Sequence, residues 1–517
     1  METNKFAQAM EREVAWKTTE NGQPALNTTF DKCLDLFGTI GALRSRTEAE
    51  IKLKFSEAYR EDPLTAVKIL FYARDIELGL GERNTFKICL NWLADFATED
   101  VILNLENVVK FGRWDDLYAL DGTRAEKAAY DFMKEQFLKD CLDLKTENKP
   151  ISLLGKWLKS INTSSEESRA LGKKTAKMFG LSEVNYRKCL SALRTRINVI
   201  EKLMSQNEWE KINFNHVSGN ALKRYKEAFI RHQEERYREY LEAVKENKTI
   251  VVDGKEEKAK MNVKKLMPYE IIREYWKKGN LNDSLELMWK NLNDYVQGTD
   301  CNAIVMADVS GSMECTYGNA CSLRPIYTSI GLAIYFAERN TGLWHNMFMT
   351  FSSRPTWVKL KDSQTLLEKL TVVRNADWGG STDLTKALRL ILDVAVKNKL
   401  EQKDLPKSLI IISDMEFDSA TAFAEDRGTF TDLMKAEYAK YGYTLPEIVY
   451  WNAAARNDTY HCEYNAQNVR LVSGQAASVF KTLIDGKTHT PQEFMFEVIN
   501  NARYDCIKIS EQILKNC

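Results

Sequence analysis

The sequence predicts two parts of different fold class: an all-helical part, followed by an α/β domain built on a doubly wound parallel sheet. From Asp31 to about Tyr295, apolar residues recur at three- and four-residue spacing, as they do on helices that bury one face. Beyond about residue 299, short apolar runs alternate with helical patterns, which is typical of parallel strands joined by helices. The expected divisions are a flexible lead-in over residues 1–30, a helical-repeat domain over 31–298 and the α/β domain over 299–517.

Short helices with polar breaks are expected throughout the first part. Clear examples are residues 64–76, 84–96 and 185–204. A long succession of short helices is typical of helix pairs stacked as a solenoid or closed into a ring, although no fixed-period repeat is visible in the sequence. The β-branched run 249–252 is followed at once by Asp253-Gly254, so we expect it at the edge of a loop.

Five apolar runs are expected to be the strands of the α/β domain. They cover residues 303–310, 347–353, 408–415, 447–453 and 469–474. Because these runs are apolar without alternation, helices should cover both faces of the sheet. The weakly patterned stretch 454–468 is expected to be a loop at the edge of the sheet.

Charge is spread unevenly along a chain that has no formal net charge. Residues 151–280 contain 28 Lys and Arg against 17 Asp and Glu, so this stretch is strongly positive. A basic stretch between acidic flanks favours a local site for a polyanion such as RNA. The alternative is a set of Lys-rich helix faces that simply meet solvent.

The scattered cysteines and the N-terminus indicate a protein of the cell interior. No Cys-x-x-Cys pair occurs, and only His345, His461 and His489 lie in the C-terminal half, so a zinc site has little support. The N-terminus lacks the apolar core of a signal peptide, and no run reaches the ~18 apolar residues of a membrane span. We expect a soluble, cytoplasmic protein with no membrane partner.

Three polar clusters fall at the ends of expected strands. They are Asp308-Val-Ser310-Gly-Ser312, Gly379-Gly380-Ser381-Thr382-Asp383 and Ser413-Asp414. In a doubly wound sheet, ligands bind at the carboxyl ends of the strands, and alternate residues of an extended turn point the same way. Carboxylate and hydroxyl oxygens are hard ligands that suit Mg²⁺, Mn²⁺ or Ca²⁺. We therefore expect a divalent cation, with Mg²⁺ preferred, and an open coordination position that can accept a carboxylate of a partner.

These clusters together resemble the metal-ion-dependent adhesion site of von Willebrand factor A domains. The resemblance covers residues 299–517 and implies a set of five metal ligands: Asp308, Ser310, Ser312, Thr382 and Asp414. This chain departs from the family pattern by the insertion of Ser381 between the glycine pair and Thr382. Because Asp383-Leu384 opens a helix as in the family, the resemblance favours Thr382 over Ser381 as the loop ligand.

Other chemistry at these clusters has less support. A serine nucleophile needs a Gly-x-Ser-x-Gly turn and a downstream base, whereas the sequence at 308–312 reads Asp-Val-Ser-Gly-Ser. An aspartyl phosphatase normally needs Asp-x-Asp, and position 310 is a serine. A two-metal hydrolase needs a separate acidic cluster. Helix capping explains one cluster but not three, so we expect no catalytic residue and no small-molecule substrate.

Four strings in the helical part resemble a second family. They are residues 72–76, 79–83, 112–117 and 266–272. They are similar to the helical module of the TROVE/Ro ribonucleoprotein family, and still more similar to an uncharacterised family of phage, large-virus and plant proteins. The resemblance covers about residues 30–517. It implies a ring of helical repeats, closed by the A domain, that binds RNA on its basic faces.

Two basic helices are expected to supply the RNA contacts. The candidate residues are Arg187, Lys188, Arg194, Arg196, Lys223, Arg224 and Lys226. Phosphates bind Lys and Arg, and unstacked bases stack on aromatic or guanidinium planes. Glu234, Glu235 and Glu239 dilute the charge of the second helix, so surface salt pairs are the alternative.

A second group of charged residues, in the strings that carry the resemblance, is expected to hold neighbouring helices together. It consists of Arg74, Asp75, Glu82, Arg83, Arg113 and Asp115. We interpret these residues as an internal ion-pair network, and Trp114 as a packing residue. Removing one partner from a buried pair strands a charge, so such a network would be sensitive to substitution.

These expectations lead to a non-enzymatic, Ro-like RNA-binding protein that holds a divalent metal in its A domain. The alternative is a protein-interaction scaffold, in which the metal binds an acidic residue of a protein partner and no RNA is involved. The oligomeric state stays open, because a closed ring favours a monomer and an open arc could dimerise.

Overall fold

A computed structural model describes residues 5–252, 255–297, 301–316, 323–351, 355–376, 382–419, 429–484 and 490–510. The chain forms two compact units. The first unit contains Met1–Ala73, Glu77–Thr85 and Met267–Asp505, and the second contains Arg74–Ile76, Phe86–Leu266 and Cys506–Cys517. The first unit therefore joins the N-terminal segment to the C-terminal α/β part.

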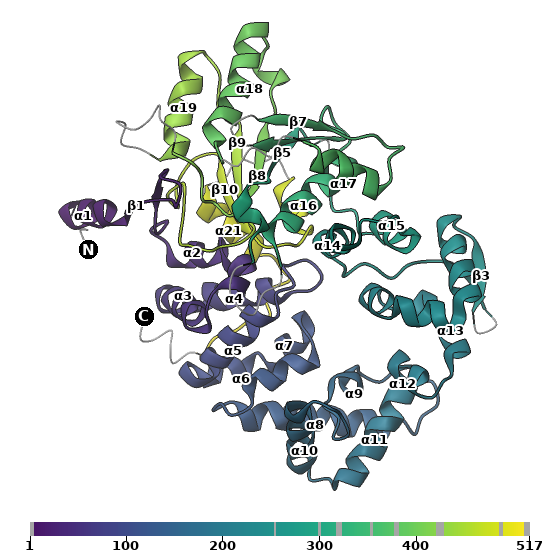
Figure 1. Cartoon of the computed structure of the whole chain (residues 1–517). Helices are drawn as coiled ribbons and strands as arrows, with labels where there is room; N and C mark the ends of the chain where they lie inside the picture. Colours follow the sequence, from purple (N-terminus) through teal and green to yellow (C-terminus); the bar gives the residue numbers. More distant parts are fainter. Residues whose placement is uncertain are drawn as a thin grey trace. The chain divides into compact units, whose positions relative to one another are not determined.

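A six-stranded, mostly parallel sheet forms the centre of the first unit (Figure 1). Its order is β10-β9-β8-β5-β6-β7, and only β6 and β7 pair antiparallel. The strands are β5 (Ala303–Asp308), β6 (Met347–Phe351), β7 (Thr356–Lys359), β8 (Ser408–Ser413), β9 (Glu447–Asn452) and β10 (Val469–Ser473). The five predicted strands and a helix-rich α/β architecture are thus confirmed, whereas the antiparallel edge strand β7 was not predicted.

Helices cover both faces of this sheet, as adjacent residues of β9 show. Trp451 packs against Phe480, with ring centroids 4.9 Å apart, and Phe480 packs in turn against Phe336 of helix α16 (Pro325–Arg339). The preceding residue, Tyr450, points to the other face, where its hydroxyl bonds to Thr431 of α19 (Phe430–Lys440) at 2.9 Å. Successive strand residues face opposite sides, so α16 and α19 lie on opposite faces.

The side of the sheet to which the chain adds new strands changes between β5 and β8. β5 is the first strand of the sheet, and the chain then adds β6 and β7 on one side before it returns to place β8 on the other. A crevice at such a reversal, beyond the carboxyl ends of the strands, is where doubly wound sheets bind ligands. The parallel register pairs Ala307 with Ile412, so Asp308 ends β5 beside Ser413 at the end of β8.

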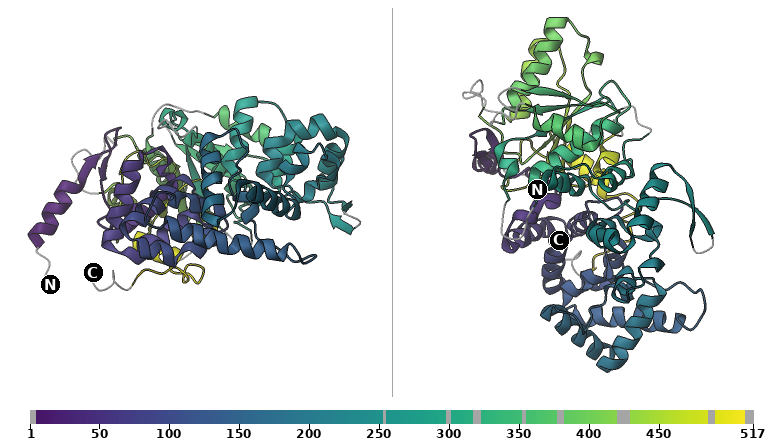
Figure 2. Two further views of the ribbon diagram at one scale, coloured as in Figure 1. Left: turned by 90° about the horizontal axis from the view of Figure 1, so that it is seen from below. Right: turned by 45° about the vertical axis from the view of Figure 1, so that its right-hand side comes forward.

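The N-terminal segment packs against this unit and differs from the expected flexible lead-in over residues 1–30. The hairpin of β1 (Trp16–Thr18) and β2 (Pro24–Leu26) follows helix α1 (Lys5–Ala15), which stands out from the unit in Figure 2. Leu26 is 2% exposed, and its backbone exchanges hydrogen bonds with Tyr460 at 2.9 Å in both directions. This pairing joins residues far apart in sequence, so local composition gave no indication of it.

The first unit contains further helices. Those in the described residues are α2 (Lys32–Phe37), η1 (Ile40–Ser45), α3 (Glu48–Glu61), α4 (Pro63–Arg74), α14 (Pro268–Lys278), α15 (Asp283–Lys290), η5 (Gly311–Glu314), α17 (Leu366–Arg374), α18 (Leu384–Asn398), η6 (Gln402–Asp404), α20 (Val479–Leu483) and α21 (Pro491–Ile499). Gly331 allows α14 to approach α16 closely, since a Cβ at this position would lie 3.2 Å from the amide nitrogen of Tyr269.

The second unit is built almost entirely of helices. These include α5 (Asn84–Phe96), α6 (Thr98–Leu103), α7 (Leu105–Phe111), η2 (Trp114–Leu120), α8 (Glu126–Asp143), α9 (Leu154–Trp157), α10 (Glu166–Phe179), α11 (Glu183–Arg196), α12 (Ile200–Ser205) and α13 (Gly219–Lys245). Phe137, Phe179 and Tyr186 bring α8, α10 and α11 together. None of the described helices combines the length and apolar character needed to cross a bilayer.

Two local expectations in the second unit are wrong. The helix expected over 185–204 breaks after Arg196, where Asn198 takes a left-handed backbone conformation with φ of 49°. The run Thr249–Val252, expected at a loop edge, is strand β3 and pairs antiparallel with β4 (Lys255–Lys258). The charged sequence of β4 concealed this hairpin, because its side chains are largely exposed and show no apolar alternation.

A buried ion pair lies within the second unit, between Arg74, the last residue of α4, and Asp116 of η2. The Arg74 side chain is fully buried, and its Nε donates to Asp116 Oδ2 at 2.8 Å. Lys87 lies 3.4 Å from Asp115 and 3.5 Å from Asp116, and the Arg113 guanidinium lies over the Trp157 ring. Elsewhere, in the first unit, Glu82 pairs with Arg44 at 2.5 Å, while Arg83 is exposed. The ion pairs therefore form separate groups, and Asp116 and Arg44 are partners that the sequence did not indicate.

Replacement of Asp116 by alanine is expected to destabilise the protein by about 3–5 kcal/mol, because it leaves the Arg74 guanidinium buried without its counter-charge. Urea unfolding of the full chain measures the difference. Lys52→Ala is the control, since Lys52 pairs with Glu48 on the surface of α3 and its loss should cost less than about 1 kcal/mol. Equal effects of the two substitutions would contradict the structural role of the buried pair.

Candidate metal centre

Asp308 ends β5 in a fully buried position, with both carboxylate oxygens hydrogen-bonded. Its Oδ1 accepts the Ser310 backbone N–H at 2.9 Å, and its Oδ2 accepts the Ser413 hydroxyl at 2.5 Å. Burial and the nearby charge of Asp414 raise the pKa of Asp308 to about 7. The Asp414 carboxylate, which follows the neighbouring strand, therefore lies close enough to disfavour ionisation of Asp308 when no cation stands between them.

Asp414 follows β8 and is 1% exposed. Arg456 Nη2 donates to its Oδ2 at 2.8 Å, and the Glu416 backbone N–H donates to its Oδ1 at 3.2 Å. The next residue, Met415, has φ of 69°, in the left-handed region that non-glycine residues seldom adopt. This strained turn directs the chain away from the sheet immediately after Asp414, and such strain is found most often at functional sites.

The predicted hydroxyl ligands occupy the two turns beside these aspartates. Ser310 and Ser312 have their hydroxyl oxygens 3.0 Å apart. The Thr382 hydroxyl lies 2.9 Å from Asp418 Oδ1 and 3.1 Å from the Glu416 carbonyl oxygen. It therefore contacts the segment that continues from Asp414. The glycine loop and Ser381 lie outside the described residues, so the choice between Ser381 and Thr382 stays a prediction.

The residues fit a divalent cation by donor chemistry and by charge. Carboxylate and hydroxyl oxygens are the ligands that Mg²⁺, Mn²⁺ and Ca²⁺ prefer. Among the described residues, the carboxylates in and around the site include Asp308, Asp414, Glu416, Asp418 and Glu20. Arg456 and Lys17 are the cations that act on this group in the described part of the chain. The surplus of negative charge favours an ion between the two buried aspartates.

Several residues of this site escaped sequence reasoning. Ser413 donates to Asp308, a role that the sequence did not indicate, and Glu416 and Asp418 follow Asp414 at alternate positions in the run Asp-Met-Glu-Phe-Asp directly after β8. This alternation, directly after a strand, was a visible indication of a larger acidic rim. The contributions of Glu20, Asn21 and Arg456 could not be seen in the same way, because they reach the site from distant parts of the chain.

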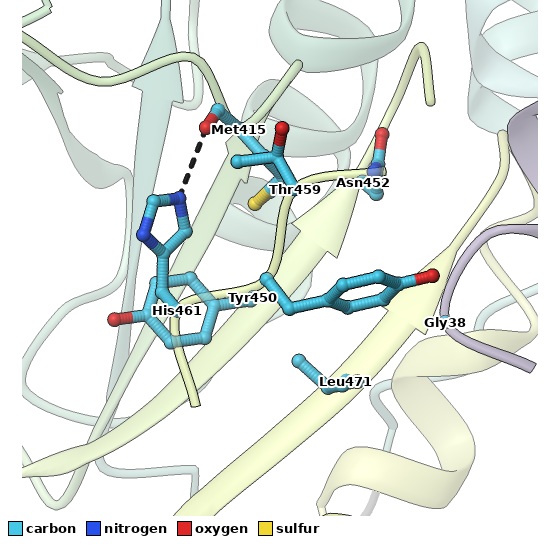
Figure 3. A pocket seen from close by; sticks show the side chains of 8 residues that line it. Gly38, Met415, Tyr450, Asn452, Thr459, His461 and Leu471 are labelled. Carbon is cyan, nitrogen blue, oxygen red and sulfur yellow. Dashed lines mark hydrogen bonds between the residues drawn. The ribbon is translucent and has the colours of Figure 1, made fainter. Parts of the chain in front are cut away.

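A small pocket lies beneath the strained turn, on the face of the sheet that α19 covers (Figure 3). His461 lines it and donates from Nε2 to the Met415 carbonyl oxygen at 2.9 Å, the bond drawn in Figure 3. A carbonyl can only accept, so Nε2 carries the proton. Burial lowers the pKa of His461 to about 4, so the imidazole is neutral near pH 7. The neutral ring supports the turn after Asp414 and adds no charge.

A different cluster, Asp31, Cys33 and Glu61, brings its potential ligand atoms within 4.8 Å of one another. Hydrogen bonds involving these groups stabilise the N-terminal end of α2. Asp31 Oδ1 accepts the Leu34 N–H at 2.7 Å, both Glu61 carboxylate oxygens accept the Lys32 N–H at 3.0 Å, and Cys33 donates to the Ala58 carbonyl oxygen. Burial raises the pKa of the Cys33 thiol, so it stays protonated. Helix capping accounts for this arrangement.

The predicted RNA-contacting residues divide into two classes. The Arg194 guanidinium donates to the Gly155 and Leu158 carbonyl oxygens and to the Ser160 hydroxyl at 2.8–3.0 Å, and burial lowers its pKa. Arg196 donates to the Thr146 and Lys149 carbonyl oxygens. These two arginines fix the backbone of the second unit.

The other five candidates lie nearer the surface. Arg187, Lys188 and Arg224 are exposed, and Lys223 and Lys226 are half-buried. Arg187 lies against the side-chain amide of Asn162. The structure therefore places α11 and α13 residues where they can meet solvent or a ligand, but it does not bring all seven together as one surface.

The fold and the site define a helix-rich protein with a mostly parallel α/β sheet, whose strand ends carry a set of hard oxygen ligands. A family model described as "Domain of unknown function (DUF2828)" matches residues 19–144 and 128–299, which is more than half of the chain, so the chain belongs to this family. A second model, "Domain of unknown function (DUF7788)", matches residues 302–512. The chain is also similar to "Uncharacterized protein L728" of Acanthamoeba polyphaga mimivirus, at 28% identity over 93% of this chain and 86% of that protein.

The stability of the first unit is expected to fall at acid pH because of His461. Its pKa is about 4 in the folded protein and about 6.5 when exposed, so the unfolded chain binds an extra proton between these values. This group alone should remove about 2 kcal/mol of stability between pH 7 and pH 5. Urea unfolding at the two pH values should show a smaller difference for His461→Gln than for the unmodified chain.

Tyr450→Phe is the matched control, because it removes a hydroxyl group that does not titrate in this range from the same pocket. It should lower stability by a similar amount at both pH values. A pH dependence left unchanged by His461→Gln would show that the imidazole titrates normally and is not held neutral by burial.

Proposed function

We propose that the C-terminal α/β part is a von Willebrand factor A-type domain that binds a divalent cation and, through it, an acidic group. The observation that carries the proposal is the pair of buried aspartates at the reversal of the sheet, Asp308 after β5 and Asp414 after β8. The strand order and the two serines that follow Asp308 support it. Mg²⁺ fits the oxygen donors, and Asp308, Ser310, Ser312, Thr382 and Asp414 would hold it.

The ion would provide binding rather than chemistry. A dication held largely by neutral hydroxyls and a few carboxylates keeps positive charge, and an open position on it attracts a carboxylate. The Ser310 hydroxyl is hydrogen-bonded to the Ser312 hydroxyl, and the nearby His461 is hydrogen-bonded through Nε2 to a backbone carbonyl beneath the turn. A serine nucleophile activated by a histidine requires these groups to be within hydrogen-bond reach of each other. We therefore propose a non-enzymatic binding protein.

Metal binding tests this proposal directly. Mg²⁺ at about 100 times its dissociation constant is expected to stabilise the protein by about 2.7 kcal/mol. In Asp308→Asn the side chain keeps its shape but loses its charge, so both the heat of Mg²⁺ binding in calorimetry and the thermal shift should be lost. Asp362→Asn is the control, because Asp362 is 80% exposed and lies outside the site. A chain that binds no Mg²⁺ or Mn²⁺ would remove the proposal.

We propose RNA as a second ligand, bound by the helical part. The observation that favours it is the exposure of Arg187, Lys188 and Arg224 within the basic stretch 151–280. Arg194 and Arg196 no longer belong among the proposed contacts, because their guanidinium groups bind backbone carbonyls. A Ro-like role therefore depends on fewer cations than the sequence predicted. The alternative is a protein-interaction scaffold that binds its partner through the metal and binds no RNA.

Affinity for a fluorescent single-stranded RNA is expected to fall steeply with salt, with a slope of about −0.7 for each phosphate neutralised. The double substitution Arg187→Ala/Lys188→Ala should weaken binding and reduce the magnitude of that slope by about 1.4, because it removes two cations. Lys403→Ala is the control, since Lys403 is an exposed lysine of the first unit. Anisotropy measured between 50 and 200 mM salt distinguishes the variants, and no affinity even at low salt would exclude RNA.

A further inference from the structure

The turn of the N-terminal hairpin lies on the rim of the candidate metal centre. Asn21 Nδ2 donates to the Thr382 hydroxyl oxygen at 3.2 Å and to the Glu416 carbonyl oxygen at 2.7 Å. In return, the Ser419 N–H donates to the Asn21 carbonyl oxygen at 3.0 Å, and Gly22 forms an antiparallel bridge with Asp418. The turn thus binds the segment that contains Asp414 and the loop that contains Thr382.

Glu20, the residue before Asn21, shares a cation with Asp414. Arg456 Nη1 donates to Glu20 Oε2 at 2.8 Å, and Nη2 of the same guanidinium donates to Asp414 Oδ2 at 2.8 Å. Both carboxylates are therefore hydrogen-bonded to the planar Arg456 guanidinium, which limits the distance between them. Burial acts to raise the pKa of Glu20, but hydrogen bonds from Asn457 and Arg456 outweigh it, and the pKa is lowered. Glu20 is thus an ionised carboxylate at the site near pH 7.

The Glu20 backbone is fixed to the acidic segment, whereas its side chain is half exposed and is held only by hydrogen bonds that the described residues Arg456 and Asn457 donate. Its N–H donates to Glu416 Oε2 at 2.7 Å, and the hydroxyl of its neighbour Thr19 donates to the Phe417 carbonyl oxygen at 2.7 Å. By contrast, the Glu20 side chain is 51% exposed. A small rotation of this side chain needs no movement of the turn.

We propose that Glu20 completes the metal centre as a third carboxylate and fills the open position of the ion from within the chain. This inference rests on the proposed metal-binding function. Arg456 would be repelled by a dication at Asp414, because both are positive, and its hold on Glu20 would weaken. The Glu20 carboxylate, which the fixed turn keeps at the site, would then exchange its hydrogen bonds with Arg456 and Asn457 for a bond to the ion. An acidic partner must displace Glu20 before it can reach the metal.

Two measurements on the full chain with Mn²⁺ test this role. Mn²⁺ replaces Mg²⁺ at oxygen sites and reports its bound waters through the relaxation of water protons. Glu20→Gln preserves the shape of the side chain and should weaken Mn²⁺ affinity at least about 10-fold. It should also add one exchanging water to the bound ion, because the vacated position is filled by solvent.

The controls separate a ligand from a structural residue. Glu11→Gln removes an equal charge from α1 of the same N-terminal segment, outside the turn that meets the metal site, and should change neither affinity nor hydration. Hydrogen exchange of the Ser419 amide, which bonds to the Asn21 carbonyl oxygen of the turn, should show that the turn stays docked in Glu20→Gln. Arg456→Gln removes a competing cation and should strengthen Mn²⁺ binding.

The measurements distinguish failure of the Glu20 proposal from failure of the proposed metal centre. If the chain binds Mn²⁺ and Asp308→Asn abolishes binding, while Glu20→Gln binds with unchanged affinity and hydration, the internal ligand is refuted and the metal centre stands. If the unmodified chain binds no Mn²⁺, the metal centre itself is refuted. Weaker affinity, one added water and a docked turn in Glu20→Gln together support the proposal.

Discussion

The parallel pairing of β5 with β8 is the constraint on which the rest of the first unit depends. It brings Asp308 and Asp414 out of the sheet side by side, in a place that excludes water. Like charges in such a place are costly unless they are protonated, hydrogen-bonded or matched by a cation. The structure uses all three means to some degree: the pKa of Asp308 is raised to about 7, Ser413 donates to its carboxylate, and Arg456 pairs with Asp414. A cation between the two aspartates would satisfy both at once.

The N-terminal segment is held to the sheet by backbone geometry as well as by polar contacts, which is why its turn reaches the candidate metal centre in a fixed position. Gly41 lies so close to β10 that a Cβ there would stand 2.7 Å from the Ser473 carbonyl oxygen and 2.8 Å from Gly474 Cα. The buried Asp35 carboxylate accepts hydrogen bonds from Thr28 and Thr29, which shapes the chain between the hairpin and α2. A segment fastened at these points cannot slide, so residues 19–22 meet the metal rim in one register.

The parts of the fold that the sequence predicted are those in which short-range pattern and final environment agree. The strand Ser408–Ser413 is buried almost throughout, and its apolar run is visible in isolation. β7 pairs only at the edge of the sheet, so its four residues carry too little pattern to be recognised. The same distinction applies to the site. Asp308 and Asp414 follow visible strands and could be named as candidates, whereas Glu20 lies beside Arg456 and Asp414 only because the hairpin Trp16–Leu26 packs against distant residues of the α/β part.

The helical part shows a second limit of prediction from the sequence. The sequence does not tell whether an arginine binds the protein's own backbone or is exposed to a ligand in the folded chain. Helical spacing made Arg194 and Arg196 RNA-contact candidates equal to Arg187 and Lys188, yet the first two donate to backbone carbonyls of the second unit. A guanidinium presents several donors in a planar fork, so it can close several loop carbonyls at once, and lysine cannot do this. The net charge of a stretch therefore overstates its attraction for a polyanion wherever arginines cap the chain's own backbone. On this ground a basic composition in a helical protein is a weaker argument for RNA binding than the exposure of each cation, one by one.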